Sequence, residues 1–136
     1  MAGISVILDA SALVAYLDPR ERHHRWAVTQ AHQLPNPWIT CEAALSESLY
    51  LLEGRYWPIL IASVRRNEIR VAFNLSNEIE PILTLMEKYA DVPMSLADAC
   101  IVRMTEVLPD PLVLTTDSDF RLYRRHGRQV VPVRTP

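Results

Sequence analysis

Apolar residues along this chain follow two kinds of pattern. Short, nearly unbroken apolar runs are typical of strands covered on both faces, and they predict strands over residues 4–8, 38–40, 70–73, 112–115 and 129–133. Longer stretches in which apolar residues recur every three or four positions predict helices over residues 10–17, 21–34, 41–53, 57–66 and 95–107, with a further helix that begins at residue 77. Strands and helices therefore alternate, which favours an α/β fold with a mostly parallel central sheet.

Glycine, proline and capping residues set several of these boundaries. Gly54 ends the third helix, and Pro109 ends the last one. Asn77, with Glu80 three positions later, has the spacing of a capping pair and predicts the start of the fifth helix. No repeat or linker interrupts this order, so we expect a single domain over residues 1–136.

The composition is that of an ordinary globular protein. Of the 136 residues, 49% are hydrophobic and 22% are charged, which excludes a disordered or low-complexity chain. No run approaches the ~20 apolar residues of a membrane helix, and the first residues lack the basic flank and cleavage pattern of a signal peptide. We therefore expect a cytoplasmic protein that does not associate with membranes.

The two cysteines predict no special chemistry. Cys41 and Cys100 each stand alone in apolar helical surroundings, so we expect small core residues rather than a disulfide. The four histidines show no ligand spacing with either cysteine, which argues against a zinc site.

Four acidic residues interrupt or end apolar stretches: Asp9, Glu47, Asp98 and Asp117. An unpaired buried carboxylate costs on the order of several kcal/mol, so a cluster of them needs a reason. Asp9 and Asp117 follow predicted strands, and the carboxyl ends of parallel strands meet at one edge of a sheet, where ligands bind. We therefore expect the four carboxylates to share a hard divalent cation such as Mg²⁺.

Each acid taken alone also has a structural explanation. Asp9 could begin a turn or cap the next helix, and Asp98 lies third after Ser95, which is the spacing of a capping box. Asp117 could be a turn residue or a first-turn acid that the helix dipole favours. The convergence of all four at one edge favours a shared site over separate explanations.

Two of the four positions have competitors. Glu42 begins the helix that carries Glu47, but an acid at the N-terminus of a helix is explained by the helix dipole, so we prefer Glu47 for the site. Glu47 could instead pair with an arginine such as Arg103. Asp119 competes with Asp117, and both could face the cation or its waters.

The basic residues are almost all arginine, and they are unevenly placed. The net charge is −2, yet Arg121, Arg124, Arg125 and Arg128 follow directly after Asp117. Arginine makes forked, permanently charged contacts with phosphate, so this run predicts a phosphate-binding surface beside the acids. A solvated basic face is the alternative.

Several of these segments resemble one known family. The segments LDASALVAYLD, ITCEAALSE, SLADA and LTTDSDF resemble, in this order, PIN-domain ribonucleases. The small size is similar to that of their VapC-like toxin branch. The resemblance implies a three-layer α/β/α sandwich, bound Mg²⁺ or Mn²⁺, cleavage of RNA, a cognate antitoxin and a homodimer. A non-catalytic PIN-like module that binds RNA or protein is the alternative.

The resemblance also implies roles for individual residues. The implied site consists of four catalytic acids, a further metal ligand, two supporting hydroxyls and three RNA-binding arginines: Asp9, Glu47, Asp98, Asp117, Asp119, Ser11, Thr116, Arg121, Arg124 and Arg125. We expect Asp9 and Asp98 to bind the cation directly. Glu47 and Asp117 would orient waters or hold a second ion, and one of them could act as general base.

The two helices on either side of Gly54 carry more apolar residues than one helix pair needs to face a sheet. These residues are Leu49, Tyr50, Leu51, Leu52, Tyr56, Trp57, Ile59, Leu60 and Ile61. The excess predicts a surface that a second copy of the chain or an antitoxin helix covers. The alternative is that all of these residues belong to the internal core.

Overall fold

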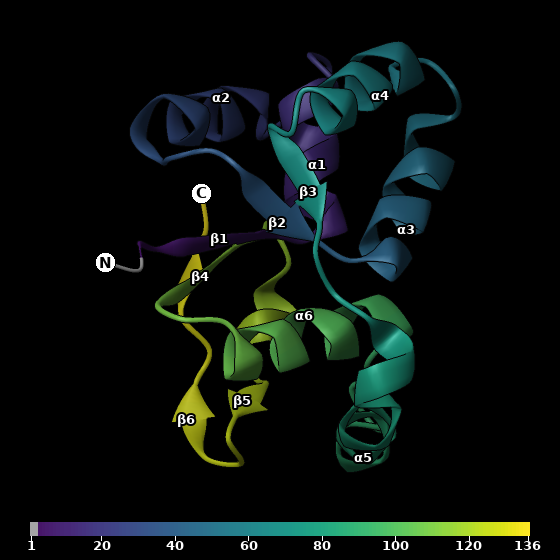
Figure 1. The fold of residues 1–136 in the computed structure, drawn as a ribbon, viewed down its shortest axis with the longest axis vertical. Coiled ribbons are helices and arrows are strands. Elements are labelled where there is room, and N and C mark those ends of the chain that lie inside the picture. Colours follow the sequence, from purple (N-terminus) through teal and green to yellow (C-terminus); the bar gives the residue numbers. More distant parts are fainter. Residues whose placement is uncertain (1–2) are drawn as a thin grey trace.

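The fold has three layers, with a sheet between two layers of helices (Figure 1). The computed structural model describes residues 3–136. The main sheet consists of β1 (Ser5–Leu8), β2 (Trp38–Thr40), β3 (Ile69–Val71), β4 (Pro111–Leu114) and β7 (Val133–Arg134). The helices are α1 (Ala10–Leu17), α2 (His24–Gln33), α3 (Glu42–Leu52), α4 (Trp57–Arg65), α5 (Ile79–Lys88) and α6 (Leu96–Val107). The predicted α/β/α architecture is confirmed.

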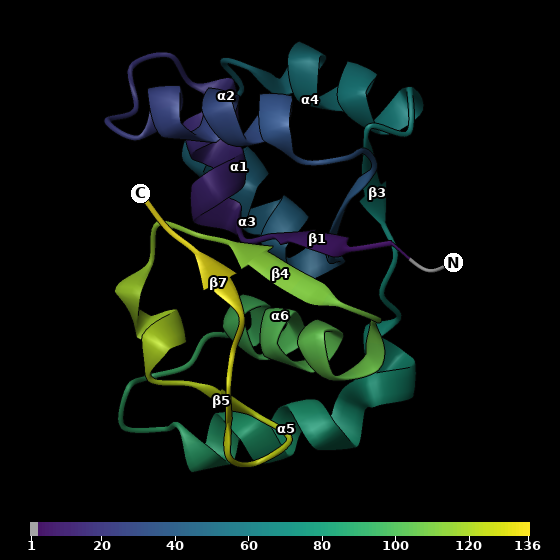
Figure 2. The same cartoon turned by 90° about the vertical axis from the view of Figure 1, so that its left-hand side faces the viewer.

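The strands of this sheet lie in the order β3-β2-β1-β4-β7, and neighbouring strands are parallel. Figure 2 shows β1, β4 and β7 side by side. After β1 the chain builds β2 and β3 on one side, and it then returns to build β4 and β7 on the other side. This reversal lies between β1 and β4, and the carboxyl ends of the strands at such a reversal are the usual ligand position in open parallel sheets.

Alternate side chains of the central strands enter two separate halves of the core. Ile7 and Val113 pack in the half that includes α5 and α6, whereas Val6, Leu8 and Leu114 pack in the half formed with α1, α3 and α4. Burying a large aliphatic side chain stabilises a fold by roughly 1.5–3 kcal/mol. The central strands therefore hold both helical layers in place.

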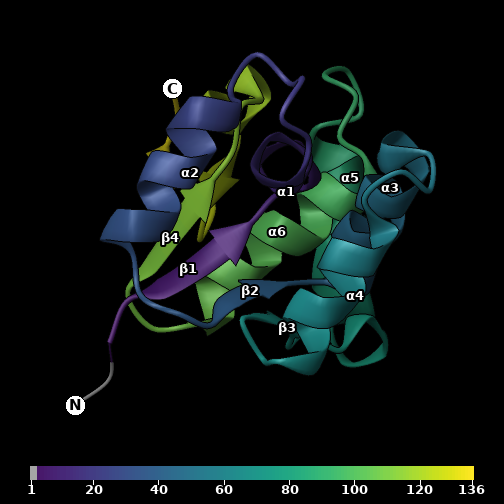
Figure 3. The same cartoon turned by 90° about the horizontal axis from the view of Figure 1, so that it is seen from above.

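Helix α3 links the two helical layers at the carboxyl edge of the sheet. It follows β2 directly and packs against both α1 and α6 (Figure 3). Ala44 lies in the core half beside α6, and Leu52 lies in the half beside α1. Glu53 (φ 53°) and Gly54 (φ 78°) then adopt the left-handed conformation, which ends α3 and turns the chain toward α4.

The C-terminal segment differs from its prediction. The sequence predicts one strand over residues 129–133, whereas the structure has β6 (Gln129–Val130) and, separately, β7. β6 pairs antiparallel with β5 (Arg124–Arg125) in a small hairpin, and β7 pairs with β4. Pro132 lies between the two strands and has no N–H for a ladder, while its carbonyl accepts the N–H of Val113. The predicted single strand is therefore wrong.

The predicted start of the fifth helix is also wrong. Asn74, and not Asn77, is the capping residue, because its side chain accepts the N–H groups of Ser76 and Asn77. These bonds begin a short 3₁₀ helix, η1 (Leu75–Glu78), which leads into α5 at Ile79. Asparagine is a favourable capping residue at either position, so the spacing between Asn77 and Glu80 did not identify the residue that caps the turn.

Helix α2 begins three residues after its predicted start. The Glu21 carboxylate accepts the N–H of His23 at 2.7 Å, and the Glu21 carbonyl accepts the N–H of His24 at 3.0 Å. These contacts form a turn before the helix, so Glu21 stabilises the helix from outside it.

Two further expectations concern the membrane and the cysteines. Within residues 3–136, no helix is long and apolar enough to cross a membrane. Cys41 and Cys100 are free and buried in the core beside α6, as predicted.

Candidate functional site

Four acidic side chains come together at the carboxyl edge of the sheet. Asp9 follows β1 and Asp117 follows β4, while Asp98 lies in the first turn of α6 and Glu47 in the middle of α3. Burial is the main cause that raises the pKa of Asp9, Asp98 and Glu47, and repulsion between the acids adds to it. The predicted acids therefore lie close enough to repel one another.

Asp9 is the most deeply buried of these acids, with 4% of its surface exposed. Its Oδ1 accepts the N–H of Ala10 at 2.8 Å, and its Oδ2 accepts the hydroxyls of Ser11 at 2.9 Å and Thr115 at 2.8 Å. Burial raises the pKa of Asp9 from 3.8 to about 6, although the hydrogen bonds favour the charged form. A cation bound here would replace the solvation that burial has removed.

Ser11 and Thr115 form a hydroxyl network that positions Asp9 between β1 and β4. Their oxygens are 3.2 Å apart. Ser11 Oγ accepts the N–H of Thr116 at 3.0 Å, and Thr115 Oγ1 accepts the N–H of Asp117 at 2.9 Å. Because each hydroxyl accepts a backbone N–H, its own proton is free to be donated to the Asp9 carboxylate.

The second hydroxyl on Asp9 comes from Thr115 and not from Thr116, the residue that the sequence indicated. Thr116 contributes its backbone N–H to the network. The register of β1 and β4 pairs Leu8 with Leu114, which puts the next residues, Asp9 and Thr115, side by side. Strand register was the signal that would have identified Thr115, and a single sequence does not reveal it.

Thr115→Val should lower the free energy of unfolding by about 1–2 kcal/mol, because it leaves the Asp117 N–H without its acceptor. It should also raise the pKa of Asp9 further, since Asp9 Oδ2 loses a donor. Urea unfolding and NMR titration of the Asp9 carboxyl would measure the two effects. Thr116→Val is the matched control and should change stability by less than about 0.5 kcal/mol. Equal effects of the two substitutions would contradict the assigned role of Thr115.

Asp98 has both a structural and a site contact. Ser95 Oγ accepts the N–H of Asp98 at 3.0 Å, and Asp98 Oδ2 accepts the N–H of Ser95 at 3.5 Å, which completes a capping box. The same Oδ2 accepts the hydroxyl of Tyr123 at 2.8 Å. Burial raises the pKa of Asp98, against the opposite effect of the Tyr123 and Ser95 hydrogen bonds. The capping explanation for Asp98 is therefore correct and coexists with its place among the acids.

Tyr123 is a site residue that the sequence did not indicate. It is fully buried, and its ring contacts Phe120 and Tyr89 edge-on, with 5.2 Å between centroids in both pairs. Burial and the neighbouring Asp98 raise the pKa of Tyr123, so its hydroxyl stays protonated and donates. Tyr123 stands in an arginine-rich run, and nothing in that local pattern predicts a buried aromatic residue beside an acid.

The acids differ in burial, contrary to the expectation that all of them are buried. Asp98, Asp117 and Asp119 are half-buried, and Glu47 is exposed. The pKa of Glu47 is nevertheless raised, first by partial desolvation of its carboxyl and then by Asp98 and Asp117. Glu47 thus lies at the open rim of the site, because α3 extends past the edge of the sheet.

Asp117 and Asp119 both remain candidates for the fourth acid. Asp117 caps the 3₁₀ helix η2 (Ser118–Arg121), where its Oδ1 accepts the N–H of Asp119 at 2.9 Å. Both carboxylates act on the pKa of Tyr123, after the larger effects of burial and Asp98. Their proximity supports a joint role at the rim of the site.

Arg103 does not pair with Glu47, so that structural explanation for Glu47 is wrong. The Arg103 guanidinium instead binds Glu78 (Nε to Oε2, 2.9 Å) and Glu106 (Nη1 to Oε1, 3.1 Å). Glu42 is the exposed first residue of α3, as a first-turn acid would be.

The arginines that follow Asp117 are divided between internal contacts and the surface. Arg125 donates to the carbonyl of Thr105 and to Oε1 of Gln129. Arg124 donates through Nη1 to the carbonyls of residues 121–123. Arg121 and Arg128 are exposed. The RNA contacts expected of Arg121, Arg124 and Arg125 stay predictions.

The donor set of the site fits a hard divalent cation. In the described part of the chain, no three acidic, histidine or cysteine side chains already converge in a metal-binding arrangement. Asp9 is turned toward Ser11 and Thr115, and Asp98 toward Tyr123. All the candidate ligands are nevertheless carboxylate oxygens whose mutual repulsion a dication would relieve.

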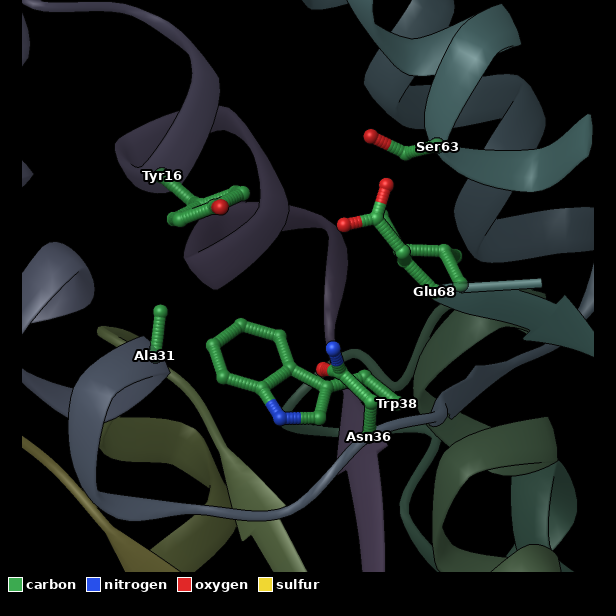
Figure 4. Close-up of a pocket in the computed structure, with 7 residues that line it drawn as sticks. Tyr16, Ala31, Asn36, Trp38, Ser63 and Glu68 are labelled. Carbon is green, nitrogen blue, oxygen red and sulfur yellow. The ribbon is translucent and has the colours of Figure 1, made fainter. Parts of the chain in front are cut away.

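A separate enclosed pocket of about 70 Å³ lies at the opposite edge of the sheet (Figure 4). Trp38 and Ile69, the first residues of β2 and β3, line it together with Tyr16, Ser63 and Glu68. Figure 4 shows the Glu68 carboxyl and the Ser63 hydroxyl near each other on the side opposite Tyr16. Such a volume holds a few water molecules but no organic substrate. The chemistry is therefore to be sought among the acids at the carboxyl edge.

Comparison with known proteins identifies the family of the chain. The PIN domain family model matches residues 6–125, a range that includes all the acids described above. Ribonuclease VapC26 of Mycobacterium tuberculosis is 27% identical over 132 residues, which cover 94% of this chain and 93% of the relative. With the parallel sheet and the acids at its carboxyl edge, this match leads to one conclusion: the chain belongs to the PIN domain family.

Proposed function

We propose that this chain is a metal-dependent endoribonuclease that hydrolyses RNA phosphodiester bonds, and that it is the toxin of a toxin–antitoxin pair. The observation that carries the proposal is the buried Asp9 carboxyl, whose pKa is raised to about 6 at the carboxyl ends of β1 and β4. A buried acid that weakens the ligand-free fold needs a ligand that offsets the cost. Family membership and the ribonuclease name of the relative support the same activity.

The proposed cofactor is Mg²⁺ or Mn²⁺. Asp9 and Asp98 would bind it directly, because hydrogen bonds hold both carboxylates in place. Glu47, Asp117 and Asp119 would add negative charge around the cation from the more exposed side of the site. A cation bound there would supply the acidity that activates water and the positive charge that favours departure of the leaving oxygen.

Three hydroxyls would orient the two direct ligands. Ser11 and Thr115 hold one oxygen of Asp9, and Tyr123 holds one oxygen of Asp98. In each case the hydrogen bond limits rotation of the carboxylate, so the remaining lone pairs keep a defined direction. Such supporting contacts typically change metal affinity or activity by about 10- to 100-fold when they are removed.

RNA would be held mainly through its phosphates. Arg121 and Arg128 are exposed, and Arg124 has donors beyond the Nη1 that binds carbonyls. Arginine contacts with phosphate position a strand but carry little sequence information. The arginine run therefore supports binding of RNA rather than recognition of one sequence.

Exposed apolar side chains on α3 and α4 support a protein partner. Leu52 and Leu60 are buried, but five of the nine apolar residues in this helix pair are exposed: Tyr50 (80%), Leu51 (50%), Trp57 (41%), Ile59 (53%) and Ile61 (46%). Internal packing in one chain therefore does not account for them. A second copy of the chain or an antitoxin helix would cover some of these side chains, and we expect this binding to take place in the cytoplasm.

RNA cleavage by the purified full chain is the direct test of the proposal. Structured and unstructured RNAs would be incubated with Mg²⁺, Mn²⁺ or EDTA, and we expect cutting only with a cation. Asp98→Asn should lose this activity, because it removes a proposed direct ligand, while its thermal melt stays cooperative.

The opposite result has an equally clear meaning. If wild-type protein cuts no RNA and neither cation changes its melting temperature, the acids are structural. The chain would then be a non-catalytic PIN-like module that binds RNA or protein.

A further inference from the structure

A groove of about 690 Å³ lies between α5 and the β5–β6 hairpin, outside the cluster of acids. Unlike the enclosed pocket at the opposite edge, it is large enough for a nucleotide. We propose that this groove binds one nucleotide of the RNA strand beside the cleaved bond, with a phosphate at Lys88 and Arg124 and a base at Glu80 and Thr84. This inference rests on the proposed ribonuclease function and adds a substrate subsite to it.

Direct contacts connect the groove to the acids. Tyr123 donates to Asp98, and its ring packs edge-on against Tyr89. The Tyr89 hydroxyl in turn accepts the N–H of Arg124 at 2.9 Å, and Lys88 precedes Tyr89 in the chain. Two neighbouring rings therefore connect a proposed metal ligand with Arg124 at the groove, and the proposed RNA strand would pass from the acids to the groove over the surface that covers these rings.

Two cationic side chains, Lys88 and Arg124, line the groove, and the Glu106 carboxylate that also lines it accepts hydrogen bonds from Arg103 and from the N–H of His126. Lys88, the only lysine of the chain, donates from Nζ to the carbonyl of Gly127 at 3.0 Å, which leaves two donors on its ammonium group. Arg124 binds carbonyls through Nη1, which leaves Nε and Nη2 as donors. Two partly satisfied cations that line one groove form a suitable site for a phosphate.

The hairpin that forms one wall is held in position by α6. Arg125 donates to the carbonyl of Thr105, and the Glu106 carboxylate accepts the N–H of His126 at 2.7 Å. Residues 126–128 form a three-residue loop between β5 and β6, in which His126 (φ 51°) and Gly127 (φ 82°) are left-handed. Because the wall is already ordered, binding there pays little conformational entropy.

The other end of the groove has a different chemistry. Pro81 and Leu85 offer apolar surface to the face of a base, and Glu80 and Thr84 offer oxygen acceptors. The Glu80 carboxylate repels a second phosphate and accepts hydrogen bonds, so it favours the amino groups of cytosine, adenine or guanine. Uracil has no amino group. The groove should therefore prefer an amino-bearing base to uracil.

RNA binding in EDTA tests the phosphate end without cleavage. Fluorescence anisotropy of the full chain with short single-stranded oligomers of A, C or U would give affinities at several salt concentrations. Lys88→Gln should weaken binding about fivefold and reduce the salt dependence by about one phosphate contact. Arg65→Gln removes one exposed charge from α4, far from the groove in the fold, and should stay within about twofold of wild type.

The same measurement tests the base end. Wild type should bind oligomers of C or A more tightly than oligomers of U, and Glu80→Gln should remove most of this difference. Glu87→Gln, an exposed position of α5 that does not line the groove, should preserve it. All variants should melt cooperatively near the wild-type temperature.

Several outcomes would overturn the subsite. One is equal RNA affinity of Lys88→Gln and Arg65→Gln. Another is a preference for C or A over U that Glu80→Gln leaves unchanged. A third is the absence of RNA binding by wild type. If cleavage with Mg²⁺ occurs alongside any of them, only the groove is refuted. If the groove variants behave as expected but no cation supports cleavage, only the nuclease proposal is refuted.

Discussion

Asp9→Asn is expected to lower RNA cleavage by about 1,000-fold or more while the protein stays folded. Asparagine preserves the size of the side chain and one carbonyl oxygen, which can still accept the N–H of Ala10. The hydroxyls of Ser11 and Thr115 can turn and accept from the new amide. What is lost is the negative charge that would bind the cation, so activity should disappear without loss of the fold.

Asp110→Asn is a matched control for this substitution. Asp110 is exposed, lies just before β4 at the opposite edge of the sheet, and has φ 44°, a conformation that asparagine tolerates. It should cleave RNA at the wild-type rate. If Asp9→Asn retained activity within about tenfold of this control, the central role of Asp9 would be refuted.

The metal-free protein is expected to lose about 3 kcal/mol of stability, relative to Asp9→Asn, as the pH rises from about 4 to about 8. The Asp9 pKa is 3.8 in its ordinary state and about 6 in the fold, so the folded protein binds this proton more tightly than the unfolded chain. The resulting stabilisation is complete below about pH 4 and is lost as the pH rises through 6. Asparagine does not titrate, so the variant lacks this loss.

Urea unfolding in EDTA across this pH range would measure the difference between the two proteins. The raised pKa values of Asp98 and Glu47 act in the same direction and are present in both proteins, so they cancel in the comparison except for the repulsion between Asp9 and Asp98, which Asp9→Asn removes. If the difference in unfolding free energy between wild type and Asp9→Asn does not change with pH, burial does not raise the pKa of the Asp9 carboxyl.

A divalent cation should reverse this relationship at pH 8. Binding to the folded state alone stabilises a protein in proportion to the logarithm of ligand concentration above the dissociation constant. Wild type would gain this stabilisation, whereas Asp9→Asn would not. The residue that most destabilises the metal-free protein is thus the one that would most stabilise the metal-bound form.

Much of the fold and part of the site followed from sequence patterns alone. The parallel sheet was predictable because apolar strands alternate with amphipathic helices, and Asp9 was identifiable because a charged residue ends a wholly buried strand. Asp98 was recognisable twice, as a cap of α6 and as an acid in an apolar turn. These features depend on neighbours in the chain, which a sequence displays directly.

The rest depended on contacts between distant segments. Thr115 reaches Asp9 because of the register between β1 and β4, and Tyr123 reaches Asp98 across 25 residues of chain. Arg125 is one of a run of arginines, yet it binds the end of α6. Neither the register of two strands nor the partner of an arginine follows from local pattern, so the supporting residues of the site were missed or given other roles.

The order of the strands bears on when the proposed site is completed during synthesis of the chain. β1 is made first but lies between β2 and β4, and β4 is among the last strands to be made. Until residues 111–117 leave the ribosome, Asp9 lacks the hydroxyl of Thr115 and the site lacks Asp117. Under the proposed function, a chain that has not yet reached these residues would hold an incomplete set of acids, so the site for cutting RNA would form only after β4 and Asp117 have been made.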